Sequence, residues 1–190
     1  MNEIIEKSRC YFLKHIENFG KDPYGLRQHV HEANRWAEHV ISIEKNINSD
    51  AIKIAVWLHD IGHYPIDKSK DHAVTSYEMS RNFLSQNQCQ KETMDLALSC
   101  IRSHRAKDVM PSKIEEKLFI VIDSVSHMSD SMYINMSIQD RNNDINFRAF
   151  EKLERDKRDI LTYSPVWNKV SKLYNAWHIL LKELENVYEI

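Results

Sequence analysis

The sequence has few of the residues that most folds use to turn the chain. Among its 190 residues there are three glycines and four prolines. Proteins built from many short β-strands need turn residues at most of their connections. Their scarcity favours an all-α protein, and we expect a single helical bundle of about six to eight helices with a C-terminal helical extension.

Cysteine is also scarce, and long hydrophobic runs are missing. Cys10, Cys89 and Cys100 are an odd number without the spacing of a zinc site, as is typical of free thiols in a reducing compartment. Residues 1–12, MNEIIEKSRCYF, mix charged residues into the segment and contain no apolar core of a signal peptide. The longest apolar runs, such as residues 118–122, fall far short of the roughly 20 residues that span a bilayer. We therefore expect a cytoplasmic protein without a membrane partner.

Neither sign of charge is in large excess. The formal net charge of -2 argues against a dedicated nucleic-acid-binding protein, although it leaves room for a local basic pocket that binds phosphate. The ten histidines are the more informative number, because imidazole is both a metal ligand and a proton carrier at neutral pH.

Apolar residues recur at helical spacing along most of the chain. The pattern predicts helices over residues 2–19, 25–45, 51–58, 71–86 and 91–105, and another from residue 112 onward. Asp71 is placed to cap the fourth of these helices. Beyond residue 140 the chain is densely charged, which predicts a solvated helix, and a last amphipathic helix follows Pro165. We assign residues 1–140 to a helical core and residues 141–190 to an extension that packs on the same domain. The extension could either cap a pocket or form a homodimer.

Polar residues that ligate metals stand where an apolar core would be expected to continue. The apolar helix 51–58 ends in His59 and Asp60, after which Gly62 is expected to let the chain turn away. Asp123 follows five apolar residues directly, and His29 shares a helix face with small residues. Buried carboxylates are costly unless they are paired or bind a cation. Two imidazoles and two carboxylates suit manganese, iron, cobalt or zinc better than calcium. Alternatively, Asp123 pairs with an Arg or Lys and His29 merely fills the core.

Three segments together resemble the HD-domain metal-dependent phosphohydrolase superfamily. They are HVHEANRWA at residues 29–37, LHDIGH at residues 58–63 and IEEKLFIVIDSVSHM at residues 114–128. The resemblance implies an all-α fold in which one ion is bound by His29, His59, Asp60 and Asp123.

Two further segments bear on the number of ions. DHAVTSYEMSRNFL at residues 71–84 and IRSHR at residues 101–105 resemble the segments of two-metal members that supply additional histidines. The resemblance then implies that His72 and His104 hold a second ion, which Asp60 bridges to the first and which could be magnesium. Alternatively, one ion is bound and His63 and His72 face the substrate. The sequence departs from many two-metal members, because His63 stands where they have a Lys and only eleven residues separate Asp60 from His72.

The resemblance implies hydrolysis of a small phosphorylated substrate, expected to be a nucleotide, by metal-activated water. Asp60 would fix the metal and His63 would carry a proton to the leaving oxygen. Arg105 and Lys107 are expected to contact the substrate phosphate. His127 lies four residues after Asp123 on the same helix face, which leaves open a supporting role or an ordinary core position. Two other functions are compatible with the pattern, a mixed-valence di-iron oxygenase and a non-catalytic metal-bound binding protein.

Overall fold

The computed structural model describes residues 2–67, 69–142 and 148–188, which are helical almost throughout. They form nine α-helices and one 3₁₀ helix, η1, and contain no strand. The prediction of an all-α fold is therefore confirmed. None of the helices in these residues is both long and apolar enough to cross a membrane.

The elements follow one another along the chain with short connections. They are α1 (Asn2–Phe19), α2 (Leu26–Ile43), α3 (Ser49–Leu58), η1 (Ile61–His63), α4 (His72–Gln86), α5 (Lys91–Ser103), α6 (Ile114–Ser129), α7 (Met132–Asn142), α8 (Arg148–Ile160) and α9 (Ser164–Tyr188).

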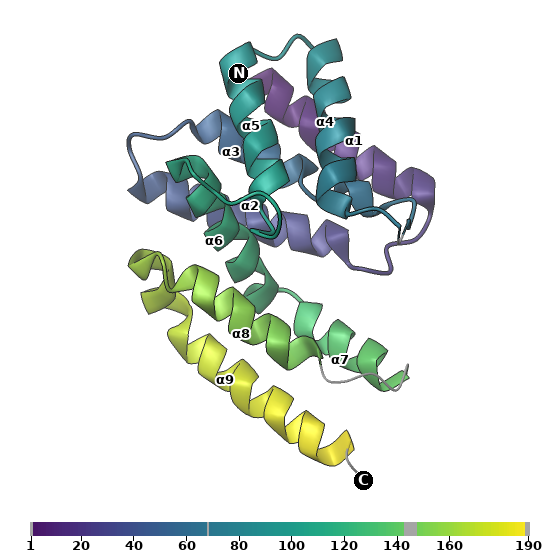
Figure 1. Ribbon diagram of the computed structural model, residues 1–190, viewed down its shortest axis with the longest axis vertical. Helices are drawn as coiled ribbons and strands as arrows, with labels where there is room; N and C mark the ends of the chain where they lie inside the picture. The colour runs from purple at the N-terminus through teal and green to yellow at the C-terminus, as the bar shows by residue number, and fades with distance from the viewer. Residues whose placement is uncertain (1, 68, 143–147, 189–190) are drawn as a thin grey trace.

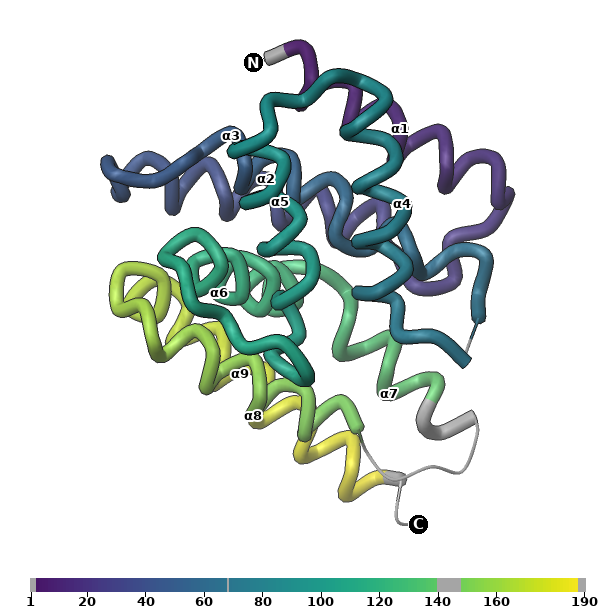
Figure 2. The backbone as a smooth tube through the Cα atoms, turned by 45° about the horizontal axis from the view of Figure 1, so that its top comes forward, coloured from purple at the N-terminus to yellow at the C-terminus, as the bar shows by residue number. Residues whose placement is uncertain are grey.

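Helix α6 is the centre of the bundle. It packs against α2, α3 and α5 on one side and against α7, α8 and α9 on the other. Figures 1 and 2 show the earlier helices stacked above it and α8 and α9 running together below it. Because neighbours surround α6, its residues 118–128 are buried on every face, which explains the apolar run before Asp123.

The described residues contain one α-helix more than expected, because the predicted helix from residue 112 is divided in two. Asp130 adopts an extended backbone conformation and ends α6. Its side-chain Oδ1 then accepts a hydrogen bond of 2.7 Å from the Met132 N–H, at the start of α7. The boundary that we placed at residue 140 falls within α7, and the division into core and extension stays a prediction.

Gly62 serves a different purpose from the turn that we expected. Its N–H donates to Ser76 Oγ of α4 at 2.8 Å. A Cβ at this position would lie 2.4 Å from the Ser76 backbone nitrogen and 2.7 Å from the His72 carbonyl oxygen. The missing side chain therefore lets η1 press against the first turns of α4, and this contact sets where His72 lies.

We expect Gly62→Ala to push α4 away from η1 and to lower the free energy of unfolding by about 1–3 kcal/mol, as overpacking does. The measurement is denaturant unfolding together with hydrogen exchange of the α4 amides, which should lose protection. Gly20→Ala is the control. It adds the same methyl group where nothing lies within 4 Å, so only the strain of its left-handed backbone, φ +76°, applies. Equal exchange of α4 in the two variants would contradict this explanation.

Candidate metal centre

Five elements of the bundle bring the six predicted ligand residues together. His29 comes from α2, His59 and Asp60 from the end of α3, His72 from the start of α4, His104 from the residue after α5, and Asp123 from α6. All except His72 are buried, and His72 is partly exposed. Asp71 caps α4 as predicted, since its side chain accepts a 2.9 Å hydrogen bond from the Ala73 N–H.

The first cluster is formed by His29, His59 and Asp123. His29 Nε2 lies 3.1 Å from His59 Nε2 and 3.1 Å from Asp123 Oδ1. His59 Nε2 lies 3.3 Å from the same carboxylate oxygen. Three ligand atoms thus face one small volume in which a metal ion could be held.

The second cluster is formed around Asp60 Oδ1. This oxygen lies 3.6 Å from His63 Nε2, 3.4 Å from His72 Nε2 and 3.7 Å from His104 Nε2. His72 Nε2 and His104 Nε2 are 3.2 Å apart. The other oxygen, Asp60 Oδ2, lies 3.7 Å from His29 Nε2 and 3.6 Å from His59 Nε2. The Asp60 carboxylate therefore lies between the two clusters, with one oxygen toward each.

Backbone carbonyls fix the tautomers of two of these histidines. His59 Nδ1 lies 2.9 Å from the Val56 carbonyl oxygen, and His104 Nδ1 lies 2.7 Å from that of Ile101. A carbonyl oxygen only accepts hydrogen bonds, so each ring carries its N–H on Nδ1 and directs the lone pair of Nε2 into the centre. This is the arrangement of metal-ligating histidines, and it places facing Nε2 atoms where a metal ion or a proton could lie between them.

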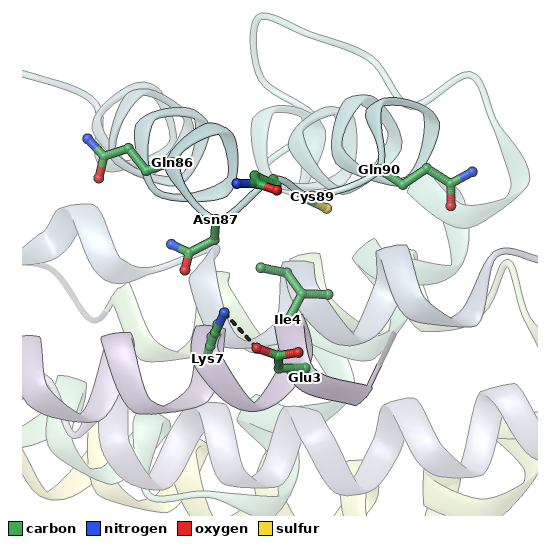
Figure 3. Close-up of a pocket in the computed structure, with 8 residues that line it drawn as sticks. Glu3, Ile4, Lys7, Gln86, Asn87, Cys89 and Gln90 are labelled. Atoms are coloured by element: carbon green, nitrogen blue, oxygen red, sulfur yellow. Dashed lines mark ion pairs between the residues drawn. The ribbon is translucent and has the colours of Figure 1, made fainter.

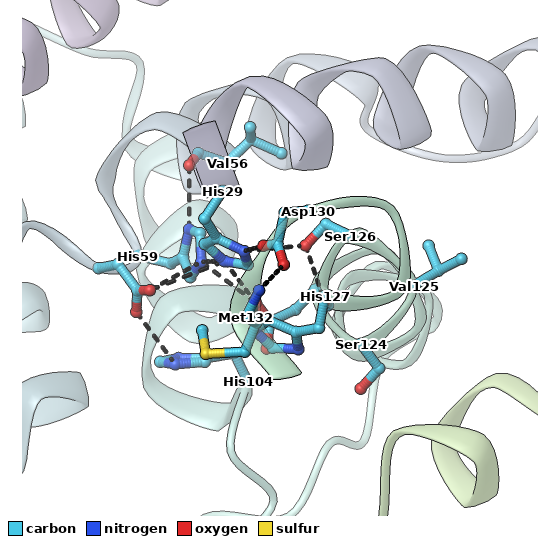
Figure 4. Close-up of polar contacts among 12 residues, drawn as sticks. His29, Val56, His59, His104, Ser124, Val125, Ser126, His127, Asp130 and Met132 are labelled. Atoms are coloured by element: carbon cyan, nitrogen blue, oxygen red, sulfur yellow. Dashed lines mark hydrogen bonds and ion pairs between the residues drawn. The ribbon is translucent and has the colours of Figure 1, made fainter. Parts of the chain in front are cut away.

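His29 is oriented by a residue that the sequence did not reveal. Its Nδ1 lies 3.1 Å from Asp130 Oδ2 and 3.1 Å from Ser126 Oγ (Figure 4). Asp130 is 101 residues away from His29 in the sequence, so no local pattern links the two. The Asp130 carboxylate accepts a hydrogen bond from the Nδ1–H of His29, so Nε2 of His29 is directed at His59 and Asp123.

The electrostatics of the centre favour a bound positive charge. Although burial alone would raise them, the neighbouring histidines hold the pKa values of Asp60 and Asp123 well below their ordinary range. Burial lowers the pKa of His29, but its hydrogen bonds to Asp123 and Asp130 outweigh that effect and raise it to about 10. Burial lowers the pKa of His72 to about 3. The carboxylates are therefore ionised and His72 is neutral at pH 7, whereas His29 holds a proton that a bound metal ion would displace.

A pocket of about 610 Å³ opens onto the two clusters. Both predicted substrate residues, Arg105 and Lys107, line it, and Arg105 also forms an ion pair with Asp71. An adjoining hollow of about 360 Å³ shares these two residues and continues past Tyr24. The pocket thus leads from solvent to the candidate ligands.

The segment beyond residue 140 contributes a wall of this pocket. Lys152, Arg155, Asp156 and Asp159 of α8 line it opposite the candidate ligands. The prediction of a solvated helix is thus right for the outer face of α8 only, because Asp156 is buried against α6 and α7. Sequence reasoning missed these residues, since a charged helix gives no sign of which of its charges are paired inside the fold.

His127 supports the first cluster. Its ring stacks on that of His29 with centroids 4.6 Å apart and planes 9° apart. Its Nε2 lies 3.9 Å from Asp123 Oδ1, on the helix face that the four-residue spacing predicts.

Another hollow lies far from these residues, between α1 and the turn that joins α4 to α5 (Figure 3). Lys7 and Glu3 form an ion pair of 2.8 Å in it, and the side chains of Asn87 and Cys89 line it. Among the described residues, both groups of potential metal ligands belong to the two clusters described above and not to this hollow.

Comparison with known proteins identifies one relationship. The family model described as HD domain matches residues 27–128, which is more than half of the chain. No curated protein and no solved structure is similar enough to the chain to be matched.

We expect Asp130→Asn to weaken divalent-metal affinity about 10-fold or more, as loss of a residue that orients a ligand does. The amide keeps an oxygen that can cap α7 but no longer offers a carboxylate to His29 Nδ1. Metal dissociation constants are measured by competition with a chelating dye.

Asp159→Asn is the matched control, because Asp159 accepts a 3.0 Å hydrogen bond from Ser124 Oγ and, within the described ranges, forms no hydrogen bond or ion pair with the candidate histidine ligands. The same metal affinity in the two variants would show that Asp130 does not orient His29.

Proposed function

Since the chain belongs to the HD-domain family, we propose that it is a metal-dependent phosphohydrolase that acts on a small phosphorylated substrate, a nucleotide in the first instance. The observation that carries this proposal is the arrangement of donor atoms. Imidazole Nε2 atoms and oxygens of two ionised carboxylates converge at the bottom of an open pocket, and the N–H groups of His59 and His104 point away from it.

The proposed ligands divide between two divalent ions of manganese, iron, cobalt or zinc, with magnesium as an alternative at the second site. His29, His59, Asp60 and Asp123 would hold one ion, and His72 and His104 would hold the other with Asp60 between them. The 3.2 Å approach of His72 Nε2 to His104 Nε2 supports two ions over one, because two facing imidazole nitrogens need a cation or a proton between them. When bound, such ions make hydroxide available near neutral pH and offset negative charge on phosphoryl oxygens.

His63 is the proposed proton carrier. It is partly exposed in the pocket, its Nε2 lies 3.6 Å from Asp60 Oδ1, and its ring stacks on His72 with centroids 3.8 Å apart. Burial lowers the pKa of His63, so the ring is neutral at pH 7 and can accept a proton and pass it to the leaving oxygen. Arg105 and Lys107 would bind phosphate groups of the substrate at the mouth of the pocket, outside the metal centre that holds the reacting one.

An oxygenase is the second candidate. The nitrogen-rich surroundings of Asp60 Oδ1, with His63, His72 and His104 within 3.7 Å, also suit redox-active iron. Oxygen consumption with iron in both sites would favour this function. A non-catalytic role fits less well, because the pocket leaves the candidate ligands accessible to a small molecule.

We also propose a cellular location and an oligomeric state. The free cysteines, of which Cys10 is exposed and Cys100 buried, agree with the expected reducing cytoplasm. The homodimer also stays a prediction, and the exposed apolar side chains of Leu173, Ile179 and Leu180 on α9 are consistent with it.

We expect the protein purified without chelator to contain two ions per chain and to release phosphate from nucleotides. His72→Ala should contain one ion, and Asp60→Ala should lose metal and activity together. Elemental analysis and phosphate release are the measurements. His31→Ala, which removes an exposed histidine of α2, is the control. Full metal content and turnover in Asp60→Ala would refute the site.

We expect His63→Ala to lower kcat about 100-fold, the effect of losing one general acid–base group, and to leave the metal content unchanged. The pH profile of kcat should also lose one of its limbs. If the variant loses metal instead, His63 is a ligand; an unchanged pH profile would remove it from proton transfer.

A further inference from the structure

The pocket has two walls of different chemistry. The candidate ligands Asp60, His104 and Asp123 form one, and α8 forms the other with Lys152 and Arg155. These two cations are three residues apart and therefore share one face of α8. Helix α8 lies outside residues 27–128, so the family match assigns it no role.

A buried network holds α8 in register against the site. Asp156, which is 1% exposed, accepts hydrogen bonds from Lys152 Nζ at 2.6 Å and from Tyr133 Oη at 2.9 Å. Lys152 Nζ also lies 2.8 Å from His127 Nδ1. The same Nδ1 lies 3.3 Å from Asp156 Oδ2, so His127 joins Lys152 and Asp156 in one buried network. Fully partnered buried polar groups specify one arrangement, which fixes the Arg155 backbone relative to the metal ligands.

The cationic side chains that line the pocket differ in whether they already form an ion pair within the protein. Lys152 is matched by Asp156, and Arg105 is paired with Asp71. Arg155 and Lys107 make no hydrogen bond or ion pair within the described part of the chain, although both line the pocket. Of the carboxylates nearby, Asp156 is engaged as above, and Asp159, which also lines the pocket, accepts a hydrogen bond from Ser124 Oγ with one oxygen. Two cations on separate elements are thus left for a ligand.

We propose that Arg155 and Lys107 form a second anion-binding position, which takes a phosphate beyond the one that reacts. The substrate class is then a compound with at least two linked phosphates, such as a nucleoside diphosphate or triphosphate, rather than a simple monophosphate ester. A guanidinium binds phosphate in a bidentate manner, and a volume of about 610 Å³ accommodates more than one phosphate group. This inference rests on the proposed function, because the metal centre defines the first phosphate position.

The test compares two non-hydrolysable probes that differ by one phosphonate group, methylphosphonate and methylenediphosphonate. Calorimetry measures their affinity for the protein as purified, and elemental analysis verifies the metal content after each titration. We expect Arg155→Gln and Lys107→Gln to weaken methylenediphosphonate binding about 10-fold each, as loss of a charge-assisted contact does. Methylphosphonate binding should change less than about 2-fold, since its one group occupies the metal centre.

Arg158→Gln is the matched control, since Arg158 is exposed on the same helix and is not among the residues that line the pocket. Equal methylenediphosphonate affinity in Arg155→Gln and Arg158→Gln, with methylphosphonate still bound, would overturn the second position and leave the proposed function standing. A wild-type protein that binds neither probe and releases no phosphate from nucleotides would overturn both.

Discussion

The structure depends on two ionised carboxylates, Asp60 and Asp123, that are buried among histidines. Carboxylates away from water destabilise a fold unless positive charge or donors surround them. The surrounding helices supply these partners. An imidazole from α2 and one each from the end of α3, the start of α4 and the end of α5 lie next to one of the carboxylates. The apolar surface of α6 then follows, because the helix that carries Asp123 must lie in the middle of the bundle to meet all of them.

The parts of the site that the sequence predicts are those with local signals. His59 and Asp60 interrupt an apolar helix, Asp123 ends an apolar run, and Asp71 caps the helix that carries His72. The rest depends on contacts between distant segments. Asp130 and the α8 side chains join the site only through tertiary packing, so neither period nor spacing marks them. The division of the predicted sixth helix also depends on a contact between distant segments. Asp130, which accepts the first hydrogen bond of α7, lies against His29 of α2.

The family match and the pocket do not cover the same residues. The HD-domain segment ends at residue 128 and contains all six candidate ligands, whereas the pocket continues onto α8. The proposed metal ligands thus lie inside the family segment, whereas Arg155 of the proposed second anion position lies outside it. A helix outside the shared segment can change its charges without disturbing the metal ligands, provided that the buried contacts of Asp156 remain.

Asp130 connects two events in the assembly of the protein. One oxygen of its carboxylate lies at the Nδ1 of His29, and the other accepts the first hydrogen bond of α7. During synthesis, a chain ending at residue 128 would already carry every candidate ligand and yet leave the ring of His29 without this partner. The orientation of His29 by Asp130 is therefore completed only when the chain has reached the start of α7.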